Sequence, residues 1–471
     1  MAVLAIDQGT SATKALVVDD DGSVLGVAEV PVAVHATSGG GVELDPEALW
    51  QSVVAAGQQA LTSAGHPSLL AIGLANQGET VLAWDRRTGQ PDGPAIVWQD
   101  RRSTEICEAL APHAARLAHL TGLELDPYFV APKIAWLRGR VAPGLTITTT
   151  DTWLLHRLCG AFVTDVATAG RSLLLDLESG AWSDEACRVF GIDPAGLARV
   201  VGNATPLGDC TTFGGSVPVT GACVDQQAAL FAETCHTAGE AKCTYGTGAF
   251  MLACTGSTPT RSANGLVGCP AWSLDGALTW CLDGQVYTAG AAVSWLIDMG
   301  IMQSPGDLDL LGGAVVDSAG TTFVPALAGL AAPYWKPNAK AAFTGMSLGT
   351  ERGHLVRAAI DGIAAQVALL AHAAGRDLGA PLTRLRVDGG LTRSQTLLQV
   401  QADLLQCPVE VYPSPHATAL GVAAFAAIGA GRPLPSGTWQ PSAIVEPSIS
   451  GDEASARLAT WQAVAEATLG C

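Results

Sequence analysis

The amino-acid sequence predicts an α/β protein made of two related domains that face each other. Three observations predict this fold: a strand–turn–strand segment at residues 4–18, a second segment of the same kind at residues 241–252, and a length of 471 residues. A chain of this length is too long for a single hydrophobic core, so two domains with insertions are expected. Because the two segments lie in opposite halves of the chain, each domain is expected to contain one of them.

The first segment combines residue types that bind a phosphorylated ligand. Its apolar strand ends at Asp7, the chain reverses over Gly9, Thr10 and Ser11, and the next strand carries Lys14. Glycine lets backbone N–H groups approach an anion closely, while the hydroxyl groups and the lysine add further donors. Asp7 can bind a divalent cation, directly or through water. The combination suits the polyphosphate of a Mg-nucleotide, and the alternative is an ordinary β-hairpin.

The second segment contains a strand, the turn Gly246-Thr247-Gly248 and another strand. Two turns of this kind in opposite halves indicate two related domains that face one nucleotide. Short Gly-Thr turns also recur by chance in a chain with 54 glycines, so the repeat by itself is moderate support for this interpretation.

The composition excludes several classes of function. A net charge of −18 argues against nucleic acids and anionic membrane surfaces as partners, although local phosphate binding is compatible with it. No apolar run reaches the length of a membrane span and the N-terminus lacks the layout of a signal peptide, so a cytoplasmic protein is expected. The 12 cysteines have no CxxC pair or zinc spacing, and we expect free, buried thiols rather than disulfides or metal ligands.

Local patterns predict the elements of the first half in order. Three strands come first, with a turn at Asp19–Gly22; a calcium loop is the alternative for these acids, but the downstream ligands that it needs are missing. A helix with Asp45 as its N-cap is expected to end near Ser63. Asp151 is expected to cap a further helix. This further helix is expected at residues 152–158. The other expected elements are strands at 69–75, 80–84 and 145–149, and a strand that ends at residue 224 and leads into a helix from 225.

The second half repeats this alternation of strands and helices. Its expected elements are a long amphipathic helix at 351–374, a strand at 385–388, helices at 394–405 and 417–430, and a final helix from residue 455. The strand, the Gly389-Gly390 turn and the following helix N-terminus together form a seat for the adenosine part of a nucleotide. An ordinary strand-to-helix turn is the alternative.

Taken together, the motifs of this sequence resemble those of the FGGY family of carbohydrate kinases, and within that family they are most similar to the motifs of glycerol kinases. The resemblance runs from residue 4 to about residue 431, and the order of the motifs makes it specific. The matching motifs are Ile6-Asp7-Gln8-Gly9-Thr10, Asn76-Gln77-Gly78-Glu79-Thr80, residues 95–102, Asp126-Pro127-Tyr128-Phe129, residues 150–154, Asp225-Gln226-Gln227, Thr244-Tyr245-Gly246-Thr247-Gly248, Ala332-Pro333-Tyr334-Trp335 and Val387-Asp388-Gly389-Gly390.

The resemblance implies two ribonuclease-H-like (actin-type ATPase) domains with an interdomain cleft, at residues 1–235 and 236–471. It implies an ATP-dependent kinase in which Mg²⁺ is organised by Asp7. The residues that would line the nucleotide are Thr10, Ser11, Ala12, Lys14, Thr247, Gly290, Ser294, Gly390 and Ser394. The residues that would hold the polyol or sugar are Gly78, Glu79, Trp98, Tyr128, Asp225, Gln226 and Phe250.

Phosphoryl transfer asks the protein mainly to position groups and to neutralise charge, and the acceptor hydroxyl must lose its proton. Asp225 is therefore the candidate general base. Trp98 and Phe250 would cover the carbon skeleton, and core packing is the alternative for both. Ser294 and Ser394 are shorter than the glutamine and asparagine that the family often has there, which leaves the adenosine contacts open.

One departure from the family concerns the substrate. Glycerol kinases have an arginine between the Gln and Glu of the 76–80 loop, and this chain has Gly78. Loss of a guanidinium removes several donors and leaves space, which favours a four- or five-carbon polyol or ketose over glycerol. The alternatives are that water fills the space in a true glycerol kinase, or that the chain is a pentulose (ribulose or xylulose) kinase.

A non-enzyme alternative is a nucleotide-driven scaffold of the actin type, because that fold is shared. Glu79, Trp98, Tyr128 and Asp225 would have no reason to coincide in a scaffold. A homodimer is expected by resemblance to the family.

Overall fold

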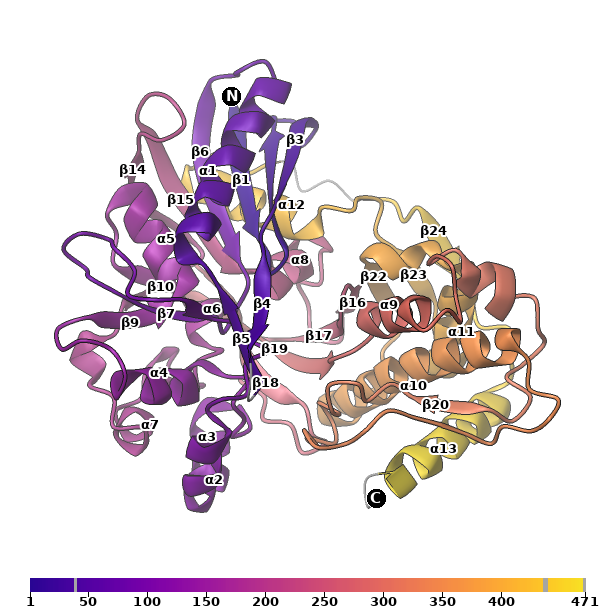
Figure 1. Ribbon diagram of the computed structural model, residues 1–471. Coiled ribbons are helices and arrows are strands. Elements are labelled where there is room, and N and C mark those ends of the chain that lie inside the picture. Colours follow the sequence, from indigo (N-terminus) through magenta and orange to yellow (C-terminus); the bar gives the residue numbers. More distant parts are fainter. Residues whose placement is uncertain (38–39, 435–438, 469–471) are drawn as a thin grey trace.

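The computed structural model describes residues 1–37, 40–434 and 439–468, and it is built around two large sheets, one in each half of the chain (Figure 1). In strand order, the six-stranded sheet of the first half contains β14 (Ala204–Cys210), β15 (Val217–Val224), β6 (Leu69–Asn76), β1 (Ala2–Gln8), β2 (Ala12–Val18) and β3 (Val24–Pro31). The seven-stranded sheet of the second half contains β18 (Val267–Leu274), β19 (Ala277–Val286), β17 (Ala249–Gly256), β16 (Ala241–Tyr245), β22 (Leu385–Asp388), β23 (Val409–Val411) and β24 (Ala443–Val445).

The two sheets repeat one pattern of strand pairing. In the first, β1 is antiparallel to β2, β2 is antiparallel to β3, and β6 and β15 continue parallel on the other side of β1. In the second, β16, β17 and β19 form the antiparallel part, and β22 and β23 continue parallel on the other side of β16. The predicted pair of strand–turn–strand segments therefore occupies equivalent places in two related units, and the expected fold class is confirmed.

Smaller sheets and helices surround the first large sheet. A five-stranded sheet contains β4 (Val34–Thr37), β5 (Gly41–Leu44), β8 (Ala95–Ile96), β7 (Val81–Trp84) and β9 (Thr146–Thr149). Two short pairs are β10 (Val163–Asp165) with β13 (Arg199–Val201), and β11 (Leu175–Asp176) with β12 (Ala181–Trp182). The helices are α1 (Pro46–Ser63), α2 (Thr104–Ala109), α3 (Ala114–Thr121), α4 (Val130–Arg138), α5 (Thr150–Cys159), α6 (Val166–Ala169), α7 (Asp184–Val189) and α8 (Asp225–Ala232), with short 3₁₀ turns at Ala111–His113 and Pro194–Gly196.

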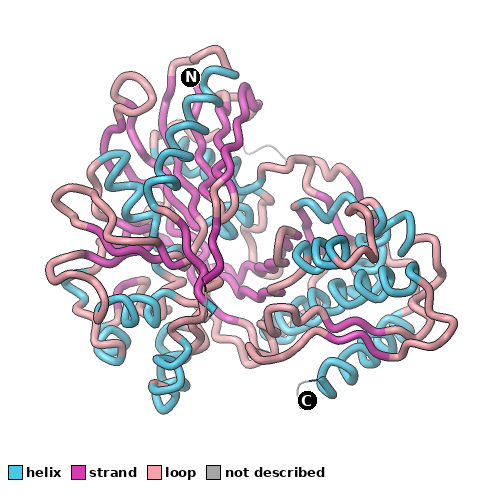
Figure 2. The backbone as a smooth tube through the Cα atoms, in the orientation of Figure 1, coloured by secondary structure: helices cyan, strands magenta, loops and turns pink. Residues whose placement is uncertain are grey.

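The second half has fewer helices, and several of them are long (Figure 2). They are α9 (Gly290–Asp298), α10 (Arg352–Leu378), α11 (Gln395–Leu405), α12 (Ala417–Gly429) and α13 (Gly451–Thr468). A strand pair, β20 (Thr322–Val324) with β21 (Ala342–Thr344), a π-helical turn at Leu308–Gly312 and a 3₁₀ turn at Gly390–Arg393 complete this half.

Helix α10 is long and apolar enough to cross a membrane, judged by length and composition alone. Inspection of the sequence had found no apolar run of that length. However, 78% of its most apolar window is buried inside the protein, where α10 packs on α11, β17 and β20. A core helix passes the same test of length and composition, and α10 has the burial of a core helix.

Helix α12 belongs to the second half by sequence but packs against the first sheet. It contacts β15, β1, β6 and α8, and Figure 1 shows it in the yellow part of the colour range beside these indigo and magenta elements. Its small residues permit this close packing. Cβ atoms added at Gly73 and Gly221 would lie 2.6 Å from backbone atoms of α12, so the glycines on the sheet are needed for it to seat.

Of the two predicted helix caps, one is confirmed and one is wrong. Asp45 caps α1 by accepting from the backbone N–H of Glu47, as predicted. Ser394, which was not predicted as a cap, caps α11 by accepting from the backbone N–H of Leu397. The predicted cap of α5 by Asp151 is wrong. This helix starts at Thr150, and the buried Asp151 carboxylate accepts a hydrogen bond from Thr164 at 2.7 Å. A tertiary partner has replaced the local one.

Candidate functional site

The first set of site residues lies at one edge of the first sheet. Strands β1, β6 and β15 are parallel, and Gln8, Asn76 and Val224 are paired at their carboxyl ends. The segments that follow these three strands therefore start side by side. They are the Gly9 turn, the loop 77–80 and the start of α8 at Asp225.

A cavity of about 190 Å³ opens at this edge, toward the Gly246-Thr247-Gly248 turn of the second half. Its volume is below the range of about 300–1,000 Å³ typical for drug-sized ligands, as expected for a small polyol or sugar. The sequence-predicted residues that line it are Thr10, Ser11, Gly78, Glu79, Trp98, Tyr128, Asp225, Gln226, Thr247 and Phe250.

Three aromatic rings form one wall of this cavity, which we call the polyol cavity after the ligand that the sequence predicts for it. The Trp98 ring lies edge-on to both Tyr128 and Phe250, with centroids 5.8 and 6.0 Å apart, and the Trp98 indole N–H donates to the Thr10 hydroxyl at 2.9 Å. Trp98 and Phe250 are only half-buried and line the cavity. Their partial exposure at the cavity favours the interpretation that they cover the carbon skeleton of a ligand over the interpretation that they only pack in the core.

A buried charge network forms the inner end of the cavity. The Arg171 guanidinium donates to Glu79 and is ion-paired with Asp283, each at 2.6 Å, and all three side chains are at most 5% exposed. Glu79 comes from the first half and Asp283 from β19 of the second, so Arg171 connects the two. Burial raises the pKa of the Glu79 carboxyl, and the neighbouring Arg171 opposes that rise. Glu79 adopts a left-handed φ of 58°, a strained conformation that often marks functional sites.

Asp225, the predicted general base, is one of the residues that line this cavity. One carboxylate oxygen accepts from the backbone N–H of Gln226 at 2.7 Å, and the side chain lines the cavity. Burial raises the pKa of Asp225 to about 7, and the nearby carboxylates of Asp7 and Glu79 add to the rise. A partly buried carboxylate with a pKa near neutrality is suited to general-base work.

Asp7 is partly buried beside this cavity but does not line it. Burial raises the pKa of its carboxyl to about 6, while the charge of Lys14, its partner across β1 and β2, lowers it. Among the described residues no group of three or more His, Cys, Asp or Glu side chains is arranged to hold a metal ion. Mg²⁺ usually takes only one or two carboxylates and completes its shell with water and phosphate oxygens, so Asp7 beside a phosphate turn fits such an ion.

A second cavity, of about 670 Å³, adjoins the first, and both are lined by Gly246 and Thr247. It is also lined by four other residues that were predicted to touch the nucleotide: Gly290, Ser294, Gly390 and Ser394. The close approach of backbone explains one glycine here, because a Cβ at Gly290 would lie 2.5 Å from the Gly246 carbonyl oxygen. The volume suits a nucleoside.

Three predicted site residues line neither cavity: Asp7, Ala12 and Lys14. Ala12 and Lys14 lie on β2 beyond the first turn, and the Lys14 ammonium lies 3.9 Å from Glu29 in a half-exposed ion pair. The Gly389-Gly390 turn was predicted to lead directly into a helix, but a 3₁₀ turn that begins at Gly390 and ends at Arg393 comes before α11.

Three functional candidates were missed by sequence reasoning. Arg171 and Asp283 line the polyol cavity, and Asp309 lines the second cavity, where it accepts from the Ser394 hydroxyl at 2.9 Å. A signal for Asp283 was available, since this carboxylate directly follows the apolar residues Trp280, Cys281 and Leu282 of a strand. Arg171 comes after the short helix α6, and Asp309 lies within the π-helical turn, and neither has a comparable local signal.

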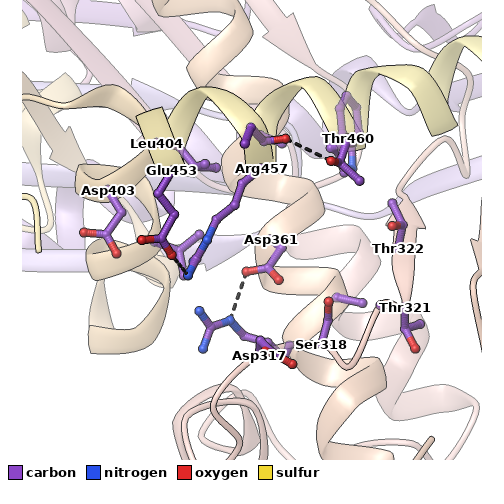
Figure 3. Close-up of a pocket in the computed structure, with 17 residues that line it drawn as sticks. Asp317, Ser318, Thr321, Thr322, Asp361, Asp403, Leu404, Glu453, Arg457 and Thr460 are labelled. Atoms are coloured by element: carbon purple, nitrogen blue, oxygen red, sulfur yellow. Dashed lines mark hydrogen bonds and ion pairs between the residues drawn. The ribbon is translucent and has the colours of Figure 1, made fainter. Parts of the chain in front are cut away.

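Another cavity, of about 490 Å³, lies between α10, α11 and α13 and shares no lining residue with the other two (Figure 3). Its two arginines, Arg357 and Arg457, are paired with Asp361 at 2.9 Å and Glu453 at 2.6 Å. Both cations are therefore already neutralised inside this cavity.

Comparison with known proteins gives consistent matches. Residues 2–232 match the N-terminal domain and residues 241–430 the C-terminal domain of the FGGY family of carbohydrate kinases. The chain is 41% identical over 480 residues to a glycerol kinase of Alkalilimnicola ehrlichii, covering 98% of this chain and 97% of that protein. It is 43% identical over 446 residues to a glycerol kinase of Thermus brockianus, covering 91% and 90%. Among solved structures, Plasmodium falciparum glycerol kinase with ADP matches with a TM-score of 0.90 and 29% identity, covering 99% of this chain and 98% of that one.

Proposed function

The chain belongs to the FGGY family of carbohydrate kinases, and from this premise we propose that it transfers a phosphoryl group from ATP to a hydroxyl of a polyol or ketose with four or five carbons. The enzyme class, an ATP-dependent phosphotransferase acting on a polyol or sugar, follows from the family. The proposal concerns the size of the acceptor and the roles of individual residues.

One observation supports the larger acceptor. Gly78 lines the polyol cavity at the position where glycerol kinases have an arginine, so no guanidinium enters the cavity there. Arg171 does not replace it freely, because its Nε and one terminal nitrogen are already engaged by Glu79 and Asp283. The vacated space can accept one or two more carbon atoms with their hydroxyl groups.

The chemistry of the cavity assigns a role to each wall. Trp98 and Phe250 cover the carbon skeleton, while the carboxylates of Glu79 and Asp225 accept hydrogen bonds from hydroxyl groups. Asp225 takes the proton of the attacking hydroxyl, which makes that oxygen a competent nucleophile. Its second carboxylate oxygen makes no hydrogen bond within the described part of the chain and can therefore receive this proton.

The nucleotide would extend from the shared turn into the larger cavity. Backbone N–H groups of the Gly9 and Gly246 turns and the hydroxyls of Thr10 and Thr247 would contact the phosphates, with the adenosine between Gly290 and Ser394. Asp7 would hold Mg²⁺, which would neutralise phosphate charge during transfer.

The test is a substrate panel with purified protein. Initial rates of ADP release are measured for glycerol, erythritol, threitol, xylitol, ribulose and xylulose, and the product is identified by phosphorus NMR. We expect kcat/KM to be at least tenfold higher for one of the longer substrates. A preference for glycerol over all the others would overturn the proposal.

A true glycerol kinase is the second candidate, favoured by identity of about 40% to glycerol kinases over nearly the full length. In that case ordered water would fill the space beside Gly78.

The proposal extends to organisation. We divide the two domains at residues 235 and 236, which is supported by the ends of the matched family domains at 232 and 241. We propose a homodimer by analogy with the family. Cytoplasmic residence is supported by the free state of all eleven cysteines in the described part of the chain.

A further inference from the structure

A fully buried lysine lies between the polyol cavity and the second phosphate turn. Lys242 is on β16, and its ammonium donates to the side-chain oxygen of Gln226 at 2.5 Å and to the hydroxyl of Thr244 at 2.7 Å. Gln226 belongs to the first half and lines the polyol cavity. Thr244 lies on the strand that leads into the Gly246 turn and also lines that cavity.

The ammonium determines which end of the Gln226 amide faces the substrate. A lysine ammonium has three donors and no acceptor, so only the amide oxygen can face it. The amide nitrogen is then directed away from Lys242, and its two N–H groups are free to donate to a substrate oxygen. In this structure no protein group of the described residues accepts from that nitrogen.

Carboxyl groups surround this lysine on several sides. Burial raises the pKa of three carboxyl groups: Asp225 on α8, Glu233 after α8 and Asp388 at the end of β22. The positive charge of Lys242 opposes this rise in each of them. Both oxygens of Glu233 lack hydrogen-bond partners. Lys242 is therefore a compensating cation for the base and for the interior next to it.

We propose that Lys242 is a positioning residue that holds the Gln226 amide with its nitrogen toward the acceptor substrate. The inference rests on the proposed function, because it assumes that a polyol or ketose occupies the cavity. Lys242 itself does not line the cavity and is not expected to touch the substrate.

The kinetic test is a double-mutant cycle with Lys242→Met, Gln226→Met and the double variant. Each single variant is expected to raise KM for the acceptor about tenfold to hundredfold, the effect of losing one strong hydrogen bond. KM for ATP should stay within twofold. The double variant should be no worse than the worse single one, because both changes remove the same contact.

Controls separate positioning from general destabilisation. Lys242→Arg keeps a buried donor and should recover at least part of the acceptor KM, while Lys340→Met removes an exposed lysine and should change nothing. The proposal would be overturned if the rise in acceptor KM of the double variant equalled the product of the rises of Lys242→Met and Gln226→Met. An unchanged acceptor KM in folded Lys242→Met would also overturn it.

A second experiment tests the orientation of the Gln226 amide directly and does not depend on enzyme turnover. A neutron crystal structure of the free protein would show the Gln226 amide deuterium atoms pointing away from Lys242. An amide nitrogen facing Lys242 would overturn the inference even if the kinase activity is established. Conversely, failure of the wild-type protein to phosphorylate or bind any of the panel substrates would refute the proposed function, and the neutron result would still decide the amide orientation.

Discussion

Replacement of Gly78 by arginine tests the substrate proposal most directly. A Cβ at this position would lie 2.9 Å from the Cγ2 of Val224, so the valine side chain must move by a few tenths of an ångström. The new guanidinium would enter a cavity of about 190 Å³ lined by the carboxylates of Glu79, Asp225 and Asp283, which favour a cation. A hydrogen bond from a charged group contributes about 1.5–3 kcal/mol, or roughly tenfold to 150-fold in affinity.

The expected result of Gly78→Arg is a rise in kcat/KM for glycerol by that factor and a fall for the longer substrate, which loses space. Rates are measured by coupled ADP release at saturating MgATP, with thermal unfolding as a check on folding. Gly78→Ala is the matched control, because it makes the same contact with Val224 without the guanidinium. An unchanged ratio of the two kcat/KM values in folded Gly78→Arg, or an equal shift in Gly78→Ala, would refute the reasoning.

Three further predictions follow from the site. Asp225→Asn should abolish turnover while nucleotide binding, measured by calorimetry, stays within threefold; near-normal turnover would remove Asp225 as the base. The pKa of Asp225 is raised to about 7 and the carboxylate is the active form, so kcat/KM should fall about tenfold per pH unit below pH 7 and become constant above it. If kcat/KM stayed constant down to about pH 4, the raised pKa of Asp225 would be contradicted. Arg171→Met leaves the two buried carboxylates of Glu79 and Asp283 without their ion-pair partner and should lower the free energy of unfolding by about 3–5 kcal/mol in urea titrations. Arg116→Met, which breaks an exposed ion pair, should cost about 1 kcal/mol or less, and equal losses would argue against this account.

Sequence reasoning was most reliable where the defining residues are neighbours in the chain. The two strand–turn–strand segments were predicted from a few consecutive residues, and the structure places them in equivalent positions of two sheets. The cap of α1 by Asp45 was predicted for the same reason. Asp151 was misjudged because Thr164, which is distant in sequence, provides the partner that decides its position.

Long-range contacts explain the rest of what was missed. Arg171 belongs to the polyol cavity only because Glu79 and Asp283, from opposite halves of the chain, meet around it. The position of α12 depends on glycines of β6 and β15 that permit its approach, and no pattern within residues 417–430 indicates which sheet the helix will cover.

The return of α12 to the first sheet constrains how the molecule can move and how it can be divided. The chain crosses from one half to the other near residues 236–240, goes back after β23, and crosses a third time after α12. Three covalent connections restrict the relative motion of the two halves more than a single linker would, and we expect closure over bound ligands to be a rotation of one half against the other. A fragment that ends at residue 235 would leave bare the face of the first sheet that α12 covers, and also the apolar side chains of the first half that pack against β17, β18 and β19.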